Sequence, residues 1–150
     1  MTRPTWDEYW INIAETISSR SVCLRNQVGA VIVKNKYIVS TGYNGAPIHQ
    51  PNCQEIGYCY REKNKIKSGT NLELCRASGS HGESNAVSIA AKIGHPTNGS
   101  TIYIVGHHTI CNNCKAVILN AGIERVILKK QDGNIKEFIP SKDWKTHSID

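Results

Sequence analysis

The chain has 150 residues, of which 39% are hydrophobic and 20% are charged, and its formal net charge is +6. This length and composition predict one globular domain, residues 1–150, with its own core. No apolar run in the sequence is long enough to cross a bilayer, and the start of the chain does not resemble a signal peptide. We therefore expect a cytoplasmic protein without a membrane partner.

The positive charge is spread along the chain, apart from small clusters at residues 63–67 and 129–130. Spread lysines are typical of solvated surface loops. No aromatic side chains interleave with the basic ones, as they do on many nucleic-acid-binding surfaces. Nucleic acid is therefore not the expected partner, whereas a pocket for a small phosphorylated substrate needs only one or two of these cations.

The predicted elements alternate between helices and strands. Apolar periodicity predicts helices at residues 5–20, 83–93 and 112–120, and strands at 28–33, 37–41, 101–105 and 125–128. A long polar stretch from 47 to 80 holds three of the six cysteines. Beyond residue 130 we expect only that Trp144 packs against the body of the protein. The alternation implies an α/β domain with a sheet covered on both faces by helices.

Two short segments carry the residues that point most clearly to chemistry. His81-Gly82-Glu83 supplies an imidazole and a carboxylate, and Cys111-Asn112-Asn113-Cys114 supplies two thiols. One histidine and two thiolates are good zinc ligands, and three protein ligands leave the open position typical of a catalytic zinc site. H-x-E followed by C-x-x-C is the pattern of zinc-dependent nucleobase deaminases, except that Ile110 replaces the proline of that pattern.

Both segments are predicted to lie at helix N-termini, where backbone N–H groups and the helix dipole favour thiolates. Two thiolates neutralise Zn²⁺ and weaken it as a Lewis acid, so the site needs a base. We expect Glu83 to take a proton from the zinc-bound water and pass it to N3 of a cytosine ring. Glu83 then delivers a second proton to the leaving ammonia.

Two alternatives remain open for this site. A fourth protein ligand, His107 or His108, would close the zinc site and make it structural. Glu83, taken alone, also fits an ordinary glutamate that complements a helix dipole.

The remaining cysteines are Cys23, Cys53, Cys59 and Cys75. Four thiolates complete a tetrahedral structural zinc site, which would tie down a long loop that has little apolar content. The spacing is not that of paired C-x-x-C motifs, so ordinary buried thiols remain an alternative, and His49 is a substitute ligand.

Several longer stretches resemble the deoxycytidylate (dCMP) deaminases, a family among the cytidine-deaminase-like zinc enzymes. The resemblance spans roughly residues 6–128. It is carried by residues 23–33, 40–47, 68–69, 73–76, 81–86, 111–114 and 120–123. The G-Y-N-G segment at residues 42–45 and the cysteine-bearing loop distinguish this branch from deaminases of free nucleosides or tRNA.

The resemblance implies a three-layer fold with a five-stranded mixed sheet between helices. It implies hydrolysis of dCMP to dUMP in a homo-oligomer, a hexamer or a dimer, with dCTP and dTTP as regulators. Mg²⁺ is a candidate companion of the regulatory nucleotide. A second, structural zinc is implied at Cys23, Cys53, Cys59 and Cys75, because several bacterial members have cysteines at the matching positions.

Asparagines matching Asn26 and Asn44 lie in the nucleotide-binding region of the family, and the resemblance implies that both contact substrate. The alternative for Asn44 is a residue selected for its turn geometry. No single ligand of the 5′-phosphate is identified; Arg25, Arg76, His107 and His108 are candidates.

Four features depart from the family pattern. Gly82 replaces an alanine and Ile110 replaces a proline, and the segments 75–81 and 103–111 are each about two residues longer than in familiar members. No predicted ligand is lost, so these changes bear on the substrate. The alternatives are another cytosine nucleotide such as dCTP or a modified dCMP, a base within nucleic acid, or a zinc protein that binds nucleotides without catalysis.

Overall fold

The structure is a computed structural model that describes residues 2–145; Met1 and residues 146–150, the ends of the predicted domain, lie outside the described residues. Five strands form one mixed sheet in the order β2-β1-β3-β4-β5. The strands are β1 (Gly29–Lys34), β2 (Tyr37–Tyr43), β3 (Thr101–Val105), β4 (Arg125–Lys129) and β5 (Ile135–Phe138). Only β3 and β4 are parallel; the other neighbours are antiparallel. The expected five-stranded mixed sheet is confirmed.

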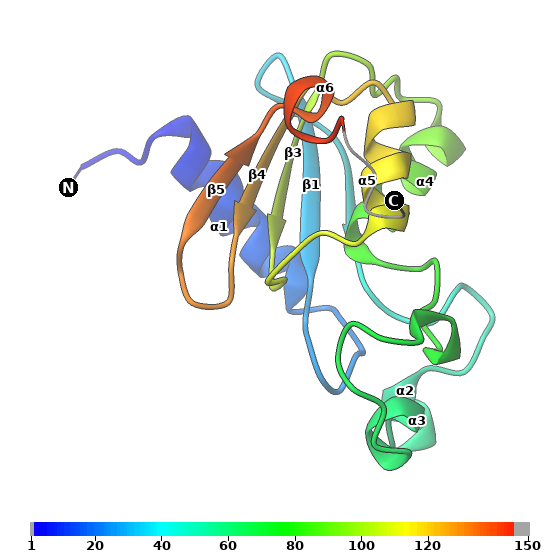
Figure 1. Cartoon of the computed structure of the whole chain (residues 1–150). Coiled ribbons are helices and arrows are strands. Elements are labelled where there is room, and N and C mark those ends of the chain that lie inside the picture. Colours follow the sequence, from blue (N-terminus) through cyan, green and yellow to red (C-terminus); the bar gives the residue numbers. More distant parts are fainter. Residues whose placement is uncertain (1, 146–150) are drawn as a thin grey trace.

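Helix α1 (Trp6–Ser18) covers one face of the sheet (Figure 1). Its N-cap is Thr5, whose hydroxyl accepts the backbone N–H of Glu8 at 3.2 Å. Alternate strand residues point toward this helix because side chains of a strand alternate between faces. The buried cluster on this side comprises Trp10, Ile11, Ala14, Val31, Val33, Tyr103, Val105 and Ile127.

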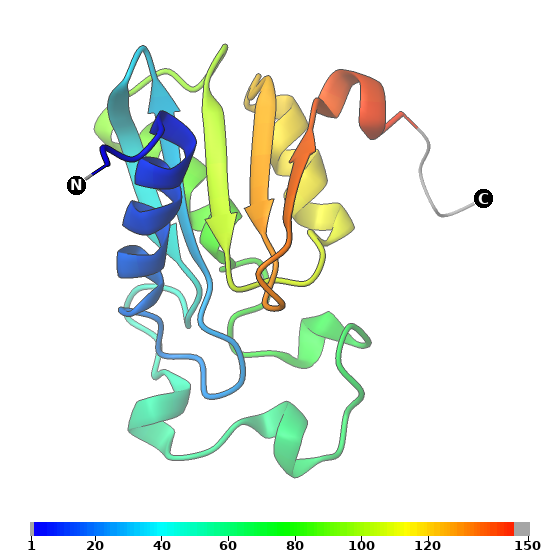
Figure 2. The same cartoon turned by 90° about the vertical axis from the view of Figure 1, so that its left-hand side faces the viewer.

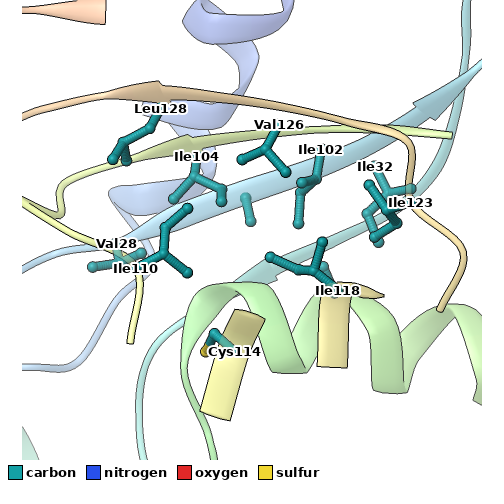
Figure 3. Packing of buried hydrophobic residues seen from close by; sticks show 12 residues of the cluster. Val28, Ile32, Ile102, Ile104, Ile110, Cys114, Ile118, Ile123, Val126 and Leu128 are labelled. Atoms are coloured by element: carbon teal, nitrogen blue, oxygen red, sulfur yellow. The ribbon is translucent and has the colours of Figure 1, made fainter. Parts of the chain in front are cut away.

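Helices α4 (Gly82–Ile93) and α5 (Asn112–Asn120) cover the opposite face, which completes the three layers. The other half of the strand side chains packs here with Ala86 of α4 and with Cys114 and Ile118 of α5. Figure 3 shows Ile110 and Cys114 among the side chains of this layer. A metal-ligand candidate is thus part of the main core.

The segment from 47 to 80 projects beyond the sheet in both views (Figures 1 and 2). It lies at the end where β1 begins and where β2, β3 and β4 finish. The predicted long polar stretch holds the short helices α2 (Cys53–Ile56) and α3 (Tyr60–Lys63) and the 3₁₀ turn η1 (Leu72–Leu74). These elements are too short to give a periodic signal in the sequence.

The C-terminal part of the described chain contains two elements that the sequence did not predict. Strand β5 pairs with β4 at the edge of the sheet, and α6 (Pro140–Asp143) follows it. Trp144 packs against the core beside Phe138, with ring centroids 5.7 Å apart, as expected for that residue. Within residues 2–145, no helix has both the length and the apolar character needed to cross a membrane.

Candidate metal and catalytic site

The structure brings His81, Cys111 and Cys114 together. Nδ1 of His81 lies 3.5 Å from each of the two cysteine sulfurs, and the three ligand atoms all lie within 4.8 Å of one another. A tetrahedral zinc with Zn–S near 2.3 Å and Zn–N near 2.0–2.1 Å has N···S edges of about 3.5 Å. The spacing of these side chains therefore matches three corners of a zinc tetrahedron.

Two helix N-termini position the three ligands. His81 is the N-cap of α4 and Cys111 is the N-cap of α5. The Cys111 sulfur accepts the backbone N–H of Cys114 at 3.4 Å, and the backbone N–H of His81 donates to the Ser84 hydroxyl at 3.0 Å. The prediction that both segments open helices is confirmed.

The local field favours thiolate at Cys111. A hydrogen bond from the Cys114 thiol, together with the nearby His81, lowers the pKa of Cys111 to about 4. The same pairing with Cys111, together with burial, raises the pKa of the Cys114 thiol. The pair thus holds a proton that a divalent cation would replace, because metal binding to thiols releases protons.

Glu83 lies beside this cluster but is not part of it. Its carboxylate is completely buried, and Oε2 lies 3.4 Å from the Cys114 sulfur. Its other oxygen, Oε1, lies 2.9 Å from Nε2 of His107. The two groups form an ion pair when His107 is protonated, and Oε1 receives no well-aligned hydrogen bond from the described residues. Oε1 therefore keeps capacity to accept a proton or a further hydrogen bond.

His107 offsets the effect of burial on the pKa of the Glu83 carboxyl. Burial alone would raise the pKa of the Glu83 carboxyl, but His107 and, further off, His81 lower it below its ordinary value. Burial likewise would lower the pKa of His107, and the Glu83 carboxylate raises it instead. The geometry places a buried carboxylate, a neighbouring imidazole and the metal-ligand group close together.

This constellation matches a known family model. Residues 4–130 match the model described as the cytidine and deoxycytidylate deaminase zinc-binding region. The chain belongs to this family. A deoxycytidylate deaminase of Mycobacterium phage D29 is 35% identical over 134 residues, which are 87% of this chain and 99% of the phage protein. A deoxycytidylate deaminase of Schizosaccharomyces pombe is 33% identical over 83% of this chain, which spans only 37% of the length of the yeast protein.

A solved structure agrees with the family assignment. The dCMP deaminase of cyanophage S-TIM5, in complex with dCMP and dUMP, has a TM-score of 0.65 and 28% identity, covering 87% of this chain and 85% of that one. The cytidine-deaminase-like three-layer fold expected from the sequence is therefore confirmed, and the family description supports zinc as the cofactor of the His-Cys-Cys site.

The two substitutions among the four departures, Gly82 and Ile110, have local structural reasons. A Cβ at Gly82 would lie 2.9 Å from Cγ1 of Val28, so the place of the expected alanine methyl is filled by that valine. Ile110 is 5% exposed and belongs to the core cluster. The loop before Cys111 is consequently fixed by a buried side chain, where the family pattern uses a proline ring.

The four remaining cysteines line one cavity of about 210 Å³ together with His81 and Cys111. The pKa of Cys53 is raised by burial and then by the nearby Cys59, Cys23 and Cys75, so the four thiols are neighbours. Their sulfur atoms lie further apart than the ligand atoms of the first site. Within residues 2–145, His81, Cys111 and Cys114 are the one group of three or more possible metal ligands whose ligand atoms all lie within 4.8 Å of one another. His49, the proposed substitute ligand, is exposed on the loop.

Asn26 and Asn44 both line the same cavity. Asn44 is 7% exposed, and its amide accepts from the Ser21 hydroxyl at 2.5 Å and from the Val28 N–H at 2.9 Å, and donates to the Asn26 carbonyl at 2.8 Å. It does not have a positive φ, so turn geometry does not explain its identity. Its amide ties β2 to the segment that precedes β1, with one amide hydrogen left over.

Sequence reasoning missed two residues of the cavity wall. Arg61 is 7% exposed and donates to the carbonyls of Lys67 and Thr70, which clamps the projecting loop. Gln131, just after β4, donates to both Asn26 and the Gly106 carbonyl. Neither lies in a periodic segment, so only the tertiary structure reveals them. The phosphate candidates Arg25, Arg76, His107 and His108 line this cavity as well.

Proposed function

We propose that this chain is a zinc-dependent deaminase that hydrolyses dCMP to dUMP and ammonia. The observation that carries the proposal is the buried Glu83 carboxylate, held 3.4 Å from Cys114 but outside the three-residue metal-ligand group. A purely structural zinc site has no use for such a group, because burying an unliganded carboxylate is costly. The deoxycytidylate deaminases among its relatives support the choice of substrate.

His81, Cys111 and Cys114 would hold the zinc ion. Bound there, zinc would supply Lewis-acid activation of water, which is what a three-ligand site with an open position does. The two cysteines contribute negative charge, and the fit of their spacing to a zinc tetrahedron supports this assignment.

Glu83 performs the proton transfers of the proposed reaction. It accepts a proton from the attacking water and delivers it to N3 of cytosine while the oxygen adds to C4. The carboxyl then carries the second water proton to the 4-amino group, the C4–N4 bond breaks, and ammonia leaves. Its burial excludes bulk water from this transfer.

Substrate contacts fall on the cavity wall. We infer that Asn26 and Asn44 meet the nucleotide there, supported by their place beside His81 in the lining. Asn44 has one amide hydrogen to offer, because its other hydrogen and its oxygen are bound within the protein. The guanidinium groups of Arg25 and Arg76 are candidates for the 5′-phosphate.

We further propose a structural zinc at Cys23, Cys53, Cys59 and Cys75. Backbone N–H groups of Arg25 and Asn26 point at the Cys23 sulfur at 3.5 Å each, and that of Ala77 points at the Cys75 sulfur at 3.4 Å. Such donors favour the thiolate form. Elemental analysis should find two zinc ions per chain, and one in Cys75→Ser. One zinc in the unaltered protein would remove the second site.

The remaining expectations concern the oligomeric state, the cellular compartment and the regulation of the protein. A homo-oligomer, hexameric or dimeric, is supported by exposed apolar side chains on the packed helices α4 and α5: Ile89, Ile93 and Leu119. Six free thiols fit the reducing cytoplasm. Regulation by dCTP and dTTP, with Mg²⁺ bound beside the regulator, stays a prediction from the family resemblance.

The experiment for substrate identity is a panel of cytosine compounds tested on zinc-loaded protein. Ammonia release should be fastest with dCMP and much slower with deoxycytidine, which lacks the phosphate. The second candidate is another cytosine nucleotide, because the lengthened loop that carries His107 and His108 lines the cavity and alters its wall. Faster turnover of dCTP or a modified dCMP than of dCMP would establish it. Nucleotide binding without any turnover would instead indicate a non-catalytic zinc protein.

A further inference from the structure

We propose that His107 is a positioning residue of this site, which holds the Glu83 carboxylate in the orientation that proton transfer requires. The inference rests on the proposed function and adds a residue that neither motif contains. Its first support is the contact itself, 2.9 Å between Nε2 of His107 and Oε1 of Glu83. The imidazole comes from the lengthened segment between β3 and Cys111, so the chain's own insertion reaches its catalytic carboxylate.

One end of that loop is fixed by a glycine. Gly106 has a φ of +96°, and a Cβ there would lie 2.0 Å from the carbonyl oxygen of Gln27. The backbone after β3 therefore presses directly on the chain that enters β1, at a distance that no side chain permits. The Gly106 carbonyl also accepts the Gln131 amide at 2.8 Å, and the same amide donates to Asn26 Oδ1 at 2.9 Å.

The other end of the loop is fixed by Ile110, which is buried in the core. Only His107, His108 and Thr109 lie between the two anchors, so the backbone has little freedom to swing His107 away. A loop pinned at both ends presents its side chain in a defined direction, which a positioning role needs.

The contact leaves the two carboxylate oxygens with different surroundings. Oε1 faces His107, and Oε2 faces the sulfur of Cys114 at 3.4 Å. A carboxylate held at one oxygen cannot rotate freely about its last side-chain bond, so the second oxygen stays directed at the metal-ligand side. The His107 side chain is 23% exposed and lines the cavity, so the same ring forms part of the substrate-side wall.

The test compares His107→Ala with His107→Gln, whose neutral side-chain amide can still contact Glu83 Oε1 in the place of Nε2. We expect His107→Ala to lower kcat for dCMP about 10–100-fold, the range typical of residues that orient a metal or catalytic group, with a smaller change in KM. His107→Gln should recover most of kcat, and zinc content should stay unchanged in both. His95→Ala, just beyond α4 and outside the cavity lining, is the matched control and should keep the kcat, KM and zinc content of the unaltered protein.

Three results would overturn the proposal. A rise in KM with kcat preserved would make His107 a phosphate ligand, and loss of zinc from His107→Ala would make it a metal ligand. A kcat that is the same in His107→Ala and in the unaltered protein would remove any role in the reaction.

A second measurement separates this proposal from the proposed function. Crystal structures of the zinc-loaded variants should show the Glu83 carboxylate turned or disordered in His107→Ala and in its original place in His107→Gln. An unchanged Glu83 in His107→Ala contradicts the positioning role even if turnover falls. Should the unaltered protein deaminate no cytosine compound, the proposed function fails, and these structures still decide whether His107 orients Glu83.

Discussion

At the scale of single residues, close packing at the start of α4 accounts for the glycine at position 82. Gly82, between His81 and Glu83, begins α4 where Val28 of the core fills the space of a Cβ. The usual alanine of the family pattern would therefore force Val28, on the chain that enters β1, to shift. Packing therefore explains why glycine stands between His81 and Glu83, and the roles proposed for those two side chains are unaffected.

Gly82→Ala should destabilise the protein, and the cause can be isolated. Overpacking costs about 1–3 kcal/mol, which exceeds the gain of about 0.5–1 kcal/mol from replacing glycine in a helix. In a Val28→Ala background the clash is gone, so the same substitution should become neutral or stabilising. Urea unfolding of the four proteins measures this, and equal effects in both backgrounds would refute the Val28 explanation.

The metal-ligand group and the carboxylate beside it could be predicted from the sequence, because metal-ligand motifs follow spacing rules. The contact of His107 with Glu83 could not be predicted, since it joins a loop to a helix across 23 residues of intervening chain. The sequence marked His107 as a candidate metal or phosphate ligand. Its partner depends on how Gly106 and Ile110 direct the loop, which no local pattern encodes.

At the scale of elements, apolar periodicity located the long helices and the central strands. The predicted bounds of β3 and α5 agree with the structure, and those of α1, β1 and β2 differ by one or two residues at most ends. Strand β5 was missed because three of its four residues are exposed, so it has no buried face to give an alternating pattern. The short helices of the 47–80 segment were missed because each is too short to show a periodic pattern.

The loop before α5 should depend on the buried side chain of Ile110. We expect Ile110→Ala to lower the free energy of unfolding by about 2–5 kcal/mol, as for other buried isoleucines. Ile110→Pro restores the family residue but still removes most of the buried side chain, so it should also destabilise. Thermal unfolding measures both; a Tm for Ile110→Pro at or above that of the unaltered protein would contradict a packing role.

An ion pair joins α1 to the sheet on the face away from the site. The Arg125 guanidinium donates to the two Asp7 oxygens at 2.9 and 2.8 Å, and the Tyr103 hydroxyl donates to Asp7 at 2.6 Å. The hydrogen bond from Arg125, followed by that from Tyr103, lowers the pKa of Asp7 although burial opposes it. A lowered folded pKa means that this stability is present above the ordinary aspartate pKa of about 3.9 and is lost as the pH falls below it.

Asp7→Asn should therefore destabilise the protein in a pH-dependent way. The Asp7 side chain is 43% exposed, so solvent screening limits the loss at neutral pH to about 1 kcal/mol or less. The difference from the unaltered protein should shrink as the pH falls through about 4 and the carboxylate is protonated. Urea unfolding across this range provides the measurement; a difference that is constant with pH would exclude the ion pair as its source.

At the scale of the whole molecule, topology gathers the site at one end of the sheet. Strands β2, β3 and β4 finish there, α4 and α5 begin there, and the cysteine-bearing segment covers the same end (Figures 1 and 2). Helix N-termini then meet loops that follow strands, which is where open α/β sheets bind ligands. The fold thus places a buried carboxylate, the three residues of the metal-ligand group and the cavity lined by Asn26 and Asn44 side by side.

The central claim is that this arrangement deaminates dCMP through Glu83. The most direct measurement is ammonia release from dCMP by the zinc-loaded protein, run in parallel with zinc-loaded Glu83→Gln and with Glu124→Gln, an exposed glutamate, as the control. We predict turnover by the unaltered protein and the control, and a loss of at least about 100-fold in Glu83→Gln with its zinc retained. Full activity of Glu83→Gln, or no turnover of dCMP by the unaltered zinc-loaded protein, would contradict the account.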